Sequence, residues 1–266
     1  MLPKDVEERI NPSIKNIVSL EQLLSSYLVA ESIIEIREER KVAFKKQSED
    51  SLPKLNSPDS RAQEMYKEFS KLVGYRYPFV YMCKIALEDM IYYEFSNDPS
   101  VVTAASQDTA HFNKEYGFGT NYTILAKVNL YDHTLNVFEE GLIQGREKGR
   151  AMQIAIPMLS CLLHDFGKSN KIRSQIQGGD GVGKVYTVHA QMSGSYIKEI
   201  LLPKYNKMLN EIPMETINSL ARAVESHHPN NASLKKDIII SEVIKADKNA
   251  RKKEFQKISK NLKGEL

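Results

Sequence analysis

The chain has 266 residues, of which 41% are hydrophobic and 27% charged, and its formal net charge is +3. These values are typical of a soluble globular protein and exclude a strongly charged chain, although so small a charge would not repel a phosphate-bearing substrate. No apolar run approaches the roughly 18 residues of a membrane span, and the amino terminus has no signal-peptide core. We therefore expect a cytoplasmic protein without a membrane partner.

The apolar residues of the first half recur at helical spacing, and no alternating strand pattern is found. We expect a first helix from Ser19 to about Lys41, followed by a polar linker over residues 47–59. A second helix, with Ala62 in its apolar stripe, should end at Gly74, where glycine is a favourable C-cap.

A third helix should run from Pro78 to about Phe95, and the less periodic residues 97–120 should connect it to the next unit. Cys83 and Cys161 lie in apolar, helix-like sequence, so we expect buried thiols rather than a disulfide. The fold class predicted from this pattern is all-α.

Helical spacing continues through the second half. A helix is expected from Thr123 to Glu140, and the next contains Pro157, where a kink or a late start is expected. A glycine-rich loop over residues 178–183 leads to a helix that begins near Thr187.

Pro213 fits the first turn of a further helix, and the last apolar stripe runs from Ile240 to Asp247. Asp247 occupies a position where the stripe calls for a hydrophobe. A carboxylate buried there without a cation or donors costs several kcal/mol, which a metal ion would avoid.

Seven residues on or at the ends of these stripes include five of the six histidines: His133, His164, Asp165, His189, His227, His228 and Asp247. Five imidazoles and two carboxylates are the ligands that two adjacent divalent ions require, with one carboxylate shared. Imidazole and carboxylate together suit iron, manganese or zinc, and the lack of cysteine argues against a structural zinc site. The set predicts a metal-dependent hydrolase.

In this order the seven residues resemble the HD-domain superfamily of metal-dependent phosphohydrolases, in the branch with an extra histidine and a double histidine. The stretch Leu162-Leu163-His164-Asp165-Phe166-Gly167-Lys168 is similar to that family's signature. The resemblance covers about residues 121–250 and implies a helical HD domain there, preceded by additional helices in residues 1–120 and followed by a basic tail over residues 251–266.

The resemblance also implies a centre of two divalent transition ions, such as iron or manganese. One ion would be bound by His133, His164 and Asp247, and the other by His189, His227 and His228. Asp165 would bridge the two ions as a catalytic residue. Lys168 would lie near the substrate phosphate, and a solvated lysine after a helix end is the alternative.

The expected activity is hydrolysis of a nucleotide-like phosphoester, from a nucleotide or a cyclic nucleotide, by a hydroxide formed from water between the two ions. The double-histidine branch includes cyclic-dinucleotide phosphodiesterases. Here Pro229-Asn230-Asn231-Ala232 follows the double histidine in place of a Gly-Tyr-Pro signature, which argues against cyclic di-GMP as the substrate.

Two other functions stay open. The first is an HD-type nuclease or relaxase-like enzyme that acts on nucleic acid. The ligand order is similar to that of the nuclease domains of CRISPR helicase-nucleases, and residues 130–137 are similar to the HD-type relaxases of conjugative elements. Residues 245–266 hold eight basic residues against three acids, which fits a nucleic-acid partner or a solvated helix face. A non-catalytic regulatory module should lack a ligand, and none is missing. The helices of residues 1–120 could serve a homodimer, a partner or the core.

The glycine-rich loop is close to a P-loop in its spacing. Val185 stands where that motif needs Ser or Thr for Mg²⁺, so we expect a lid beside the metal cleft rather than a phosphate cradle.

Overall fold

The computed structural model describes residues 52–101, 125, 127–148, 151–177, 185–206, 214–228 and 237–263. The chain divides into two compact units, Met1–Lys46 and Gln47–Leu266, and all described residues belong to the second. The predicted first helix, the predicted boundary near residue 120, the glycine-rich loop and residues 229–232 therefore lie outside the described residues.

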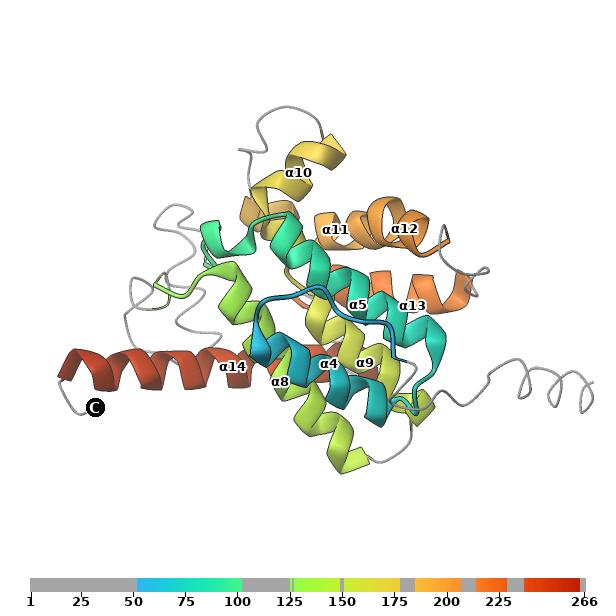
Figure 1. The fold of residues 1–266 in the computed structure, drawn as a ribbon. Helices are drawn as coiled ribbons and strands as arrows, with labels where there is room; N and C mark the ends of the chain where they lie inside the picture. Colours follow the sequence, from blue (N-terminus) through green and yellow to red (C-terminus); the bar gives the residue numbers. More distant parts are fainter. Residues whose placement is uncertain are drawn as a thin grey trace, which may run out of the picture. The chain divides into compact units, whose positions relative to one another are not determined.

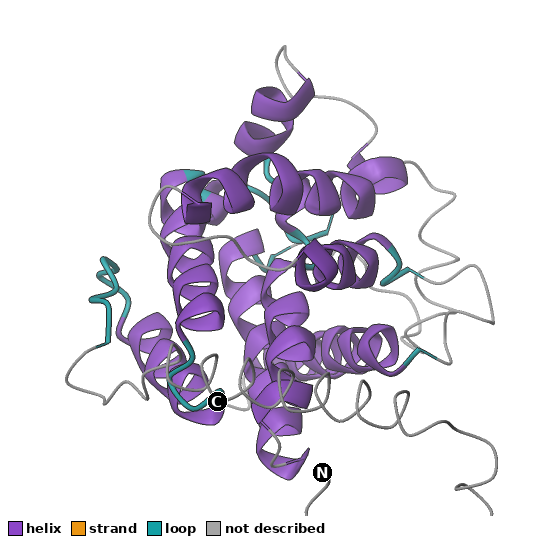
Figure 2. Cartoon of the chain, turned by 90° about the vertical axis from the view of Figure 1, so that its right-hand side faces the viewer, coloured by secondary structure: helices purple, strands orange, loops and turns teal. Residues whose placement is uncertain are grey.

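Among the described residues every regular element is a helix, which confirms the all-α class (Figure 2). The nearest approach to a sheet there is one isolated bridge between Pro99 and Asn129. None of the helices in this part of the chain is long and apolar enough to cross a bilayer.

Helices α4 (Ser60–Leu72) and α5 (Tyr77–Tyr92) form the first pair. The Asp59 side chain caps α4 by accepting a hydrogen bond from the amide of Arg61. Gly74, with φ of 64°, ends the helix as predicted, and its amide donates to the carbonyl of Lys71 at 3.0 Å. Pro78 lies in the first turn of α5, also as predicted.

The part of the predicted linker that the structure describes, residues 52–59, packs against these helices. Leu55 is buried, and the Tyr66 hydroxyl donates to the carbonyl of Pro53 at 2.9 Å.

Helices α8 (Leu130–Lys148) and α9 (Ala151–Leu163) follow. Helix α8 begins seven residues later than the predicted Thr123, because Asn129 caps it: its side chain accepts from the amide of Asp132 at 2.7 Å. Helix α9 begins six residues before Pro157, so the predicted late start is wrong. It is the central helix, in contact with α4, α5, α8, α13 and α14 (Figure 1).

The remaining helices surround this centre. They are η2 (Phe95–Asn97), η3 (Phe166–Lys168), α10 (Asn170–Gln177), α11 (Val185–Ser195), the π-helix η4 (Tyr196–Leu201), α12 (Leu202–Asn206), α13 (Met214–Glu225) and α14 (Ile238–Lys263). Residues 251–263, predicted as the start of a basic tail, are the continuation of α14.

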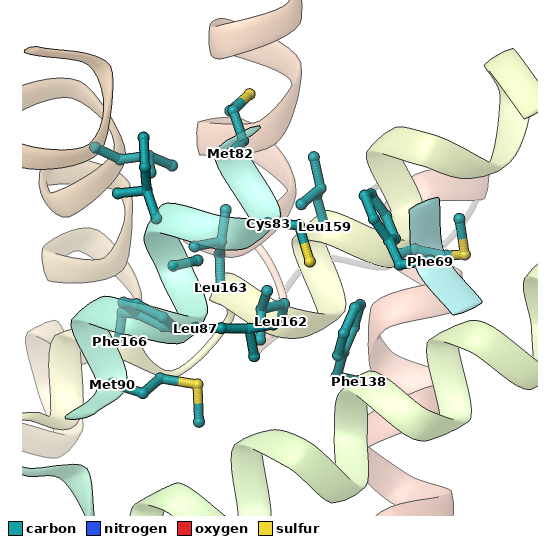
Figure 3. Packing of buried hydrophobic residues seen from close by; sticks show 14 of the residues in the cluster. Phe69, Met82, Cys83, Leu87, Met90, Phe138, Leu159, Leu162, Leu163 and Phe166 are labelled. Carbon is teal, nitrogen blue, oxygen red and sulfur yellow. The ribbon is translucent and has the colours of Figure 1, made fainter. Parts of the chain in front are cut away.

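The core lies around the carboxyl-terminal half of α9, where Leu159, Leu162 and Leu163 are fully buried (Figure 3). Cys83 and Cys161 are buried free thiols, as predicted. Burial of one leucine side chain stabilises the fold by about 1.5–3 kcal/mol. His164 and Asp165, which directly follow α9, are therefore attached to a fully buried part of this unit.

Candidate metal centre

The seven predicted ligands come from five helices and meet in one place. His133 lies in α8, His164 and Asp165 follow α9, His189 lies in α11, His227 and His228 follow α13, and Asp247 lies in α14. The sixth histidine, His111, falls outside the described residues.

Three of these residues form what we call the inner group: His133, His164 and Asp247. Each offers one ligand atom, these atoms lie within 4.8 Å of one another, and all three residues are buried. His133 Nε2 lies 3.3 Å from Asp247 Oδ1 and 3.4 Å from Asp165 Oδ2.

The other four form the outer group: Asp165, His189, His227 and His228. Their ligand atoms also lie within 4.8 Å of one another, but His228 is exposed. Asp165 Oδ1 lies 3.6 Å from His189 Nε2 and 3.5 Å from His227 Nε2, while Asp165 Oδ2 lies 3.1 Å from His164 Nε2. Asp165 therefore points one carboxylate oxygen at each group.

The backbone fixes how two of the imidazoles face this centre. His164 Nδ1 lies 2.9 Å from the carbonyl oxygen of Cys161, and His227 Nδ1 contacts the carbonyl oxygen of Val224. Carbonyl oxygens only accept hydrogen bonds, so each Nδ1 carries the proton and each Nε2 presents a lone pair.

The buried nitrogen and oxygen atoms of the centre show whether metal ions fit between these residues. His133 Nε2, His164 Nε2, His227 Nε2 and Asp165 Oδ1 are buried atoms without a hydrogen-bond partner, and all four point at the same centre. Buried acceptors that face one another are costly unless a cation lies between them. Imidazole nitrogen and carboxylate oxygen are also the donors that iron, manganese and zinc accept, so the residues fit two such ions.

The charges agree with this fit. Burial opposes ionisation of Asp165, but His164 and Lys168 hold the pKa of Asp165 well below its ordinary value. Burial lowers the pKa of His164, and burial together with Lys168 lowers the pKa of His189 to about 3. Ionised carboxylate and neutral imidazole are the forms that bind metal.

His133 shows how strongly the centre attracts positive charge. Burial and Arg251 lower its pKa, but the carboxylates of Glu254, Asp165 and Asp247 outweigh both and raise it to about 9. The field at His133 therefore favours a cation.

The glycine of the His-Asp signature has a packing reason. A Cβ on Gly167 would lie 2.0 Å from the carbonyl oxygen of His189 and 2.7 Å from the amide nitrogen of Ser193, so α11 approaches this turn at a distance that only glycine permits. The Gly167 amide donates to Ser193 Oγ at 2.9 Å, and that hydroxyl lies 2.8 Å from the carbonyl of His164 and 3.0 Å from that of His189.

The phenylalanine of the signature anchors the same turn. The ring of fully buried Phe166 packs against Phe95 and Tyr196, with centroids 4.8 Å and 4.6 Å away. The turn that carries Asp165 is therefore fixed both by the hydrogen bond from Gly167 to Ser193 and by the packing of the Phe166 ring.

Lys168 does not lie in solvent. Its side chain is only 10% exposed, and Nζ donates to Asp165 Oδ2 at 2.6 Å and to the carbonyl of Ser100 at 3.0 Å. The alternative of a solvated lysine is wrong.

Sequence reasoning missed two buried charged residues at the centre, Arg251 and Glu254, because both were counted in a basic tail. Glu254 Oε1 lies 2.9 Å from His133 Nδ1, and Arg251 Nε lies 3.8 Å from Asp247 Oδ1. The signal was present, since both continue the helical stripe of Ile240, Val243 and Asp247 at the same spacing.

Comparison with protein-family models, with curated proteins and with solved structures finds no match for this chain. The residues and geometry of the centre are therefore the basis from which we infer a function.

Proposed function

We propose that this protein is a metal-dependent phosphohydrolase or phosphodiesterase that acts on a nucleotide-like phosphoester. The observation that carries the proposal is the convergence of five imidazoles and two carboxylates, with buried nitrogen lone pairs facing a shared carboxylate. The order of these residues also resembles that of the HD-domain superfamily.

In this proposal the inner group and the outer group each hold one divalent ion, and Asp165 is shared between them. When bound, two adjacent divalent ions activate a water molecule and neutralise the charge that develops on phosphoryl oxygens. Asp165 sets the spacing of the two positions, and the carbonyls of Cys161 and Val224 keep His164 and His227 in the ligating tautomer.

Lys168 supplies a fixed positive charge beside the centre. Its ammonium group stays within hydrogen-bond reach of Asp165 because the carbonyl of Ser100 holds it from the other side. A phosphate oxygen that approaches the shared carboxylate would meet this ammonium group.

Two experiments test the proposal. Metal analysis of protein purified without chelator should find close to two transition ions per chain, and none or only one would contradict the dinuclear centre. A panel of bis(p-nitrophenyl) phosphate, cyclic dinucleotides, mononucleotides and single-stranded DNA, assayed with Mn²⁺ or Fe²⁺, should then identify the substrate class. Two bound ions without turnover of any substrate would instead favour a regulatory module.

One observation favours a second candidate, an enzyme that acts on nucleic acid. Between residues 245 and 260 of α14, the exposed residues are Gln256 and the lysines Lys245, Lys248, Lys252, Lys253, Lys257 and Lys260, whereas Asp247 and Glu254 are buried. Lys253 pairs with Glu140. A row of lysines without neighbouring exposed acids suits a phosphate backbone.

Salt dependence tests this candidate. If these lysines contact phosphates, replacing Lys252, Lys257 and Lys260 with glutamine should weaken binding of labelled single-stranded DNA, and each lost contact should reduce the salt slope by about 0.7. The matched control replaces three exposed lysines on and before α4 with glutamine: Lys54, Lys67 and Lys71. Equal binding by both variants would remove the candidate.

A further inference from the structure

Glu254 connects the far part of α14 to the inner group. It lies seven residues after Asp247, and its side chain is 3% exposed. Its Oε1 lies 2.9 Å from His133 Nδ1 and accepts a hydrogen bond from Asn136 Nδ2 at 2.7 Å. An ionised carboxylate only accepts hydrogen bonds, so this contact places a proton of His133 on Nδ1 and leaves Nε2, which faces Asp165 and Asp247, as the atom that would bind a metal ion.

We propose that Glu254 is a positioning residue that holds His133 in the tautomer and orientation of a metal ligand. The inference rests on the proposed function, because it assigns Glu254 to the support of the inner ion. A ligating histidine that donates its other N–H to a carboxylate is a stronger base and a better-oriented ligand than one without such a partner. Glu254 does for His133 what the carbonyl of Cys161 does for His164.

Arg251 stabilises the buried carboxylate of Glu254. Its Nη1 donates to Glu254 Oε2 at 3.1 Å and to Ser100 Oγ at 2.9 Å, and its Nη2 donates to the carbonyl of Ser100 at 2.8 Å. A buried carboxylate needs such a partner, since unpaired it would be protonated or would destabilise the fold. Because the Ser100 carbonyl also accepts from Lys168, both cationic side chains of the centre are held by one residue.

A purely structural role is the competing explanation, because Glu254 also joins α14 to α8. Glu140 separates the two roles. It is a buried carboxylate that joins the same helices, accepting from Asn249 Nδ2 at 3.0 Å and pairing with Lys253, and no contact between it and a predicted ligand is found among the described residues. A variant of Glu140 therefore reports the loss of a helix–helix tie alone.

The test uses the full chain with Co²⁺ as the probe, because its visible absorption reports the ligands. For Glu254→Met we expect about 10- to 100-fold weaker binding of one of the two ions and a changed absorption spectrum. Glu254→Gln should lose less affinity than Glu254→Met, because the amide oxygen can still accept from His133. Glu140→Met should bind both ions with the affinity and spectrum of the wild type, even if it unfolds at a lower temperature.

Three outcomes separate this inference from the proposed function. If Glu254→Met binds two Co²⁺ ions as the wild type does, the positioning role is wrong and the dinuclear centre stands. If the wild type binds two ions but hydrolyses no phosphoester, the proposed activity is wrong while the affinities still decide the role of Glu254. If the wild type binds no Co²⁺, both are wrong. Circular dichroism shows whether each variant is folded, and the glutamine variant keeps the test valid if the methionine variant is not.

Discussion

The inner and outer groups contain the same kinds of ligand, but different parts of the fold surround them. In the inner group all three residues are buried, Glu254 and the carbonyl of Cys161 face the imidazoles, and Arg251 lies near Asp247. In the outer group His228 is exposed, and His189 Nε2 and His228 Nε2 lie 2.7 Å apart. The inner group is therefore enclosed by the packed core, whereas the outer group reaches the surface through His228.

The largest effect is expected at the residue that both groups share. Asp165→Ala removes the carboxylate that points at both positions, so phosphodiester turnover should fall to below about a thousandth of the wild-type rate. The measurement is hydrolysis of bis(p-nitrophenyl) phosphate with Mn²⁺, together with metal analysis. Asp59→Ala, which removes the cap of α4, is the control and should lose only stability. Retained activity in Asp165→Ala would mean that the centre is wrongly assigned.

The next effect concerns the spacing between the two groups. Gly167→Ala places a methyl group against the backbone of α11, so we expect a loss of about 1–3 kcal/mol in the free energy of unfolding and weaker binding of the outer ion. Urea unfolding and metal titration measure the two effects. Gly145→Ala is the control, because its methyl group would meet only the end of the flexible Met158 side chain. Equal losses in both variants would contradict the close approach.

A contrast in stability should separate a buried ligand from an exposed one. With chelator present, His164→Ala should lower the free energy of unfolding by about 2–4 kcal/mol, because it empties a buried position. His228→Ala should change that free energy by less than about 0.5 kcal/mol, as is usual at the surface. Thermal unfolding in EDTA measures both, and similar values would show that the two groups are equally packed.

Graded removal of metal should sharpen the same contrast. We expect the ion of the outer group to leave first as chelator is added, and turnover to end with that first loss. Metal analysis after each step, followed by dialysis, gives the order. Simultaneous loss of both ions would show that burial of the inner group does not retain its ion.

The smallest effect on metal binding is expected at the Ser193 hydroxyl, which contacts the backbone of both groups. Ser193→Ala leaves the Gly167 amide without its acceptor, so the free energy of unfolding should fall by about 1–2 kcal/mol while metal content is kept. Ser195→Ala, two residues further along the chain, is the control. A stable variant that loses the outer ion would give Ser193 a larger role in placing His189 than its hydrogen bonds indicate.

Much of the fold followed from local sequence. Gly74 and Pro78 marked helix ends correctly, because the capping and first-turn preferences of glycine and proline are local. The start of α8 was missed because Asn129 was not recognised as an N-cap. Of the two expectations at Pro157, a kink or a late start, the late start is wrong, because α9 begins six residues before this proline despite the local preference of proline for the first turn.

The seven ligand candidates were visible in the sequence because histidine is rare here and those positions fall on apolar stripes. The residues that support these ligand candidates could not be identified from the sequence. Ser193, Cys161 and Val224 act through a hydroxyl or a backbone carbonyl, and such contacts have no residue-type signature. Glu254 and Arg251 were hidden for another reason: a count of charges over a segment does not distinguish the buried face of a helix from its exposed face.

Helix α14 carries Asp247 and Glu254 on one face and a row of lysines on the other, over one unbroken stretch of 26 residues. The role of α14 at the centre therefore depends on which of its residues face inward as much as on its composition. One residue inserted between Asp247 and Lys253 would turn all that follows by about 100°. It would bring the Lys253 ammonium group to the place where the Glu254 carboxylate meets His133, with the net charge of the chain unchanged. Among relatives of this protein, we expect substitutions on the outer face of α14 to be common and insertions within it to be rare.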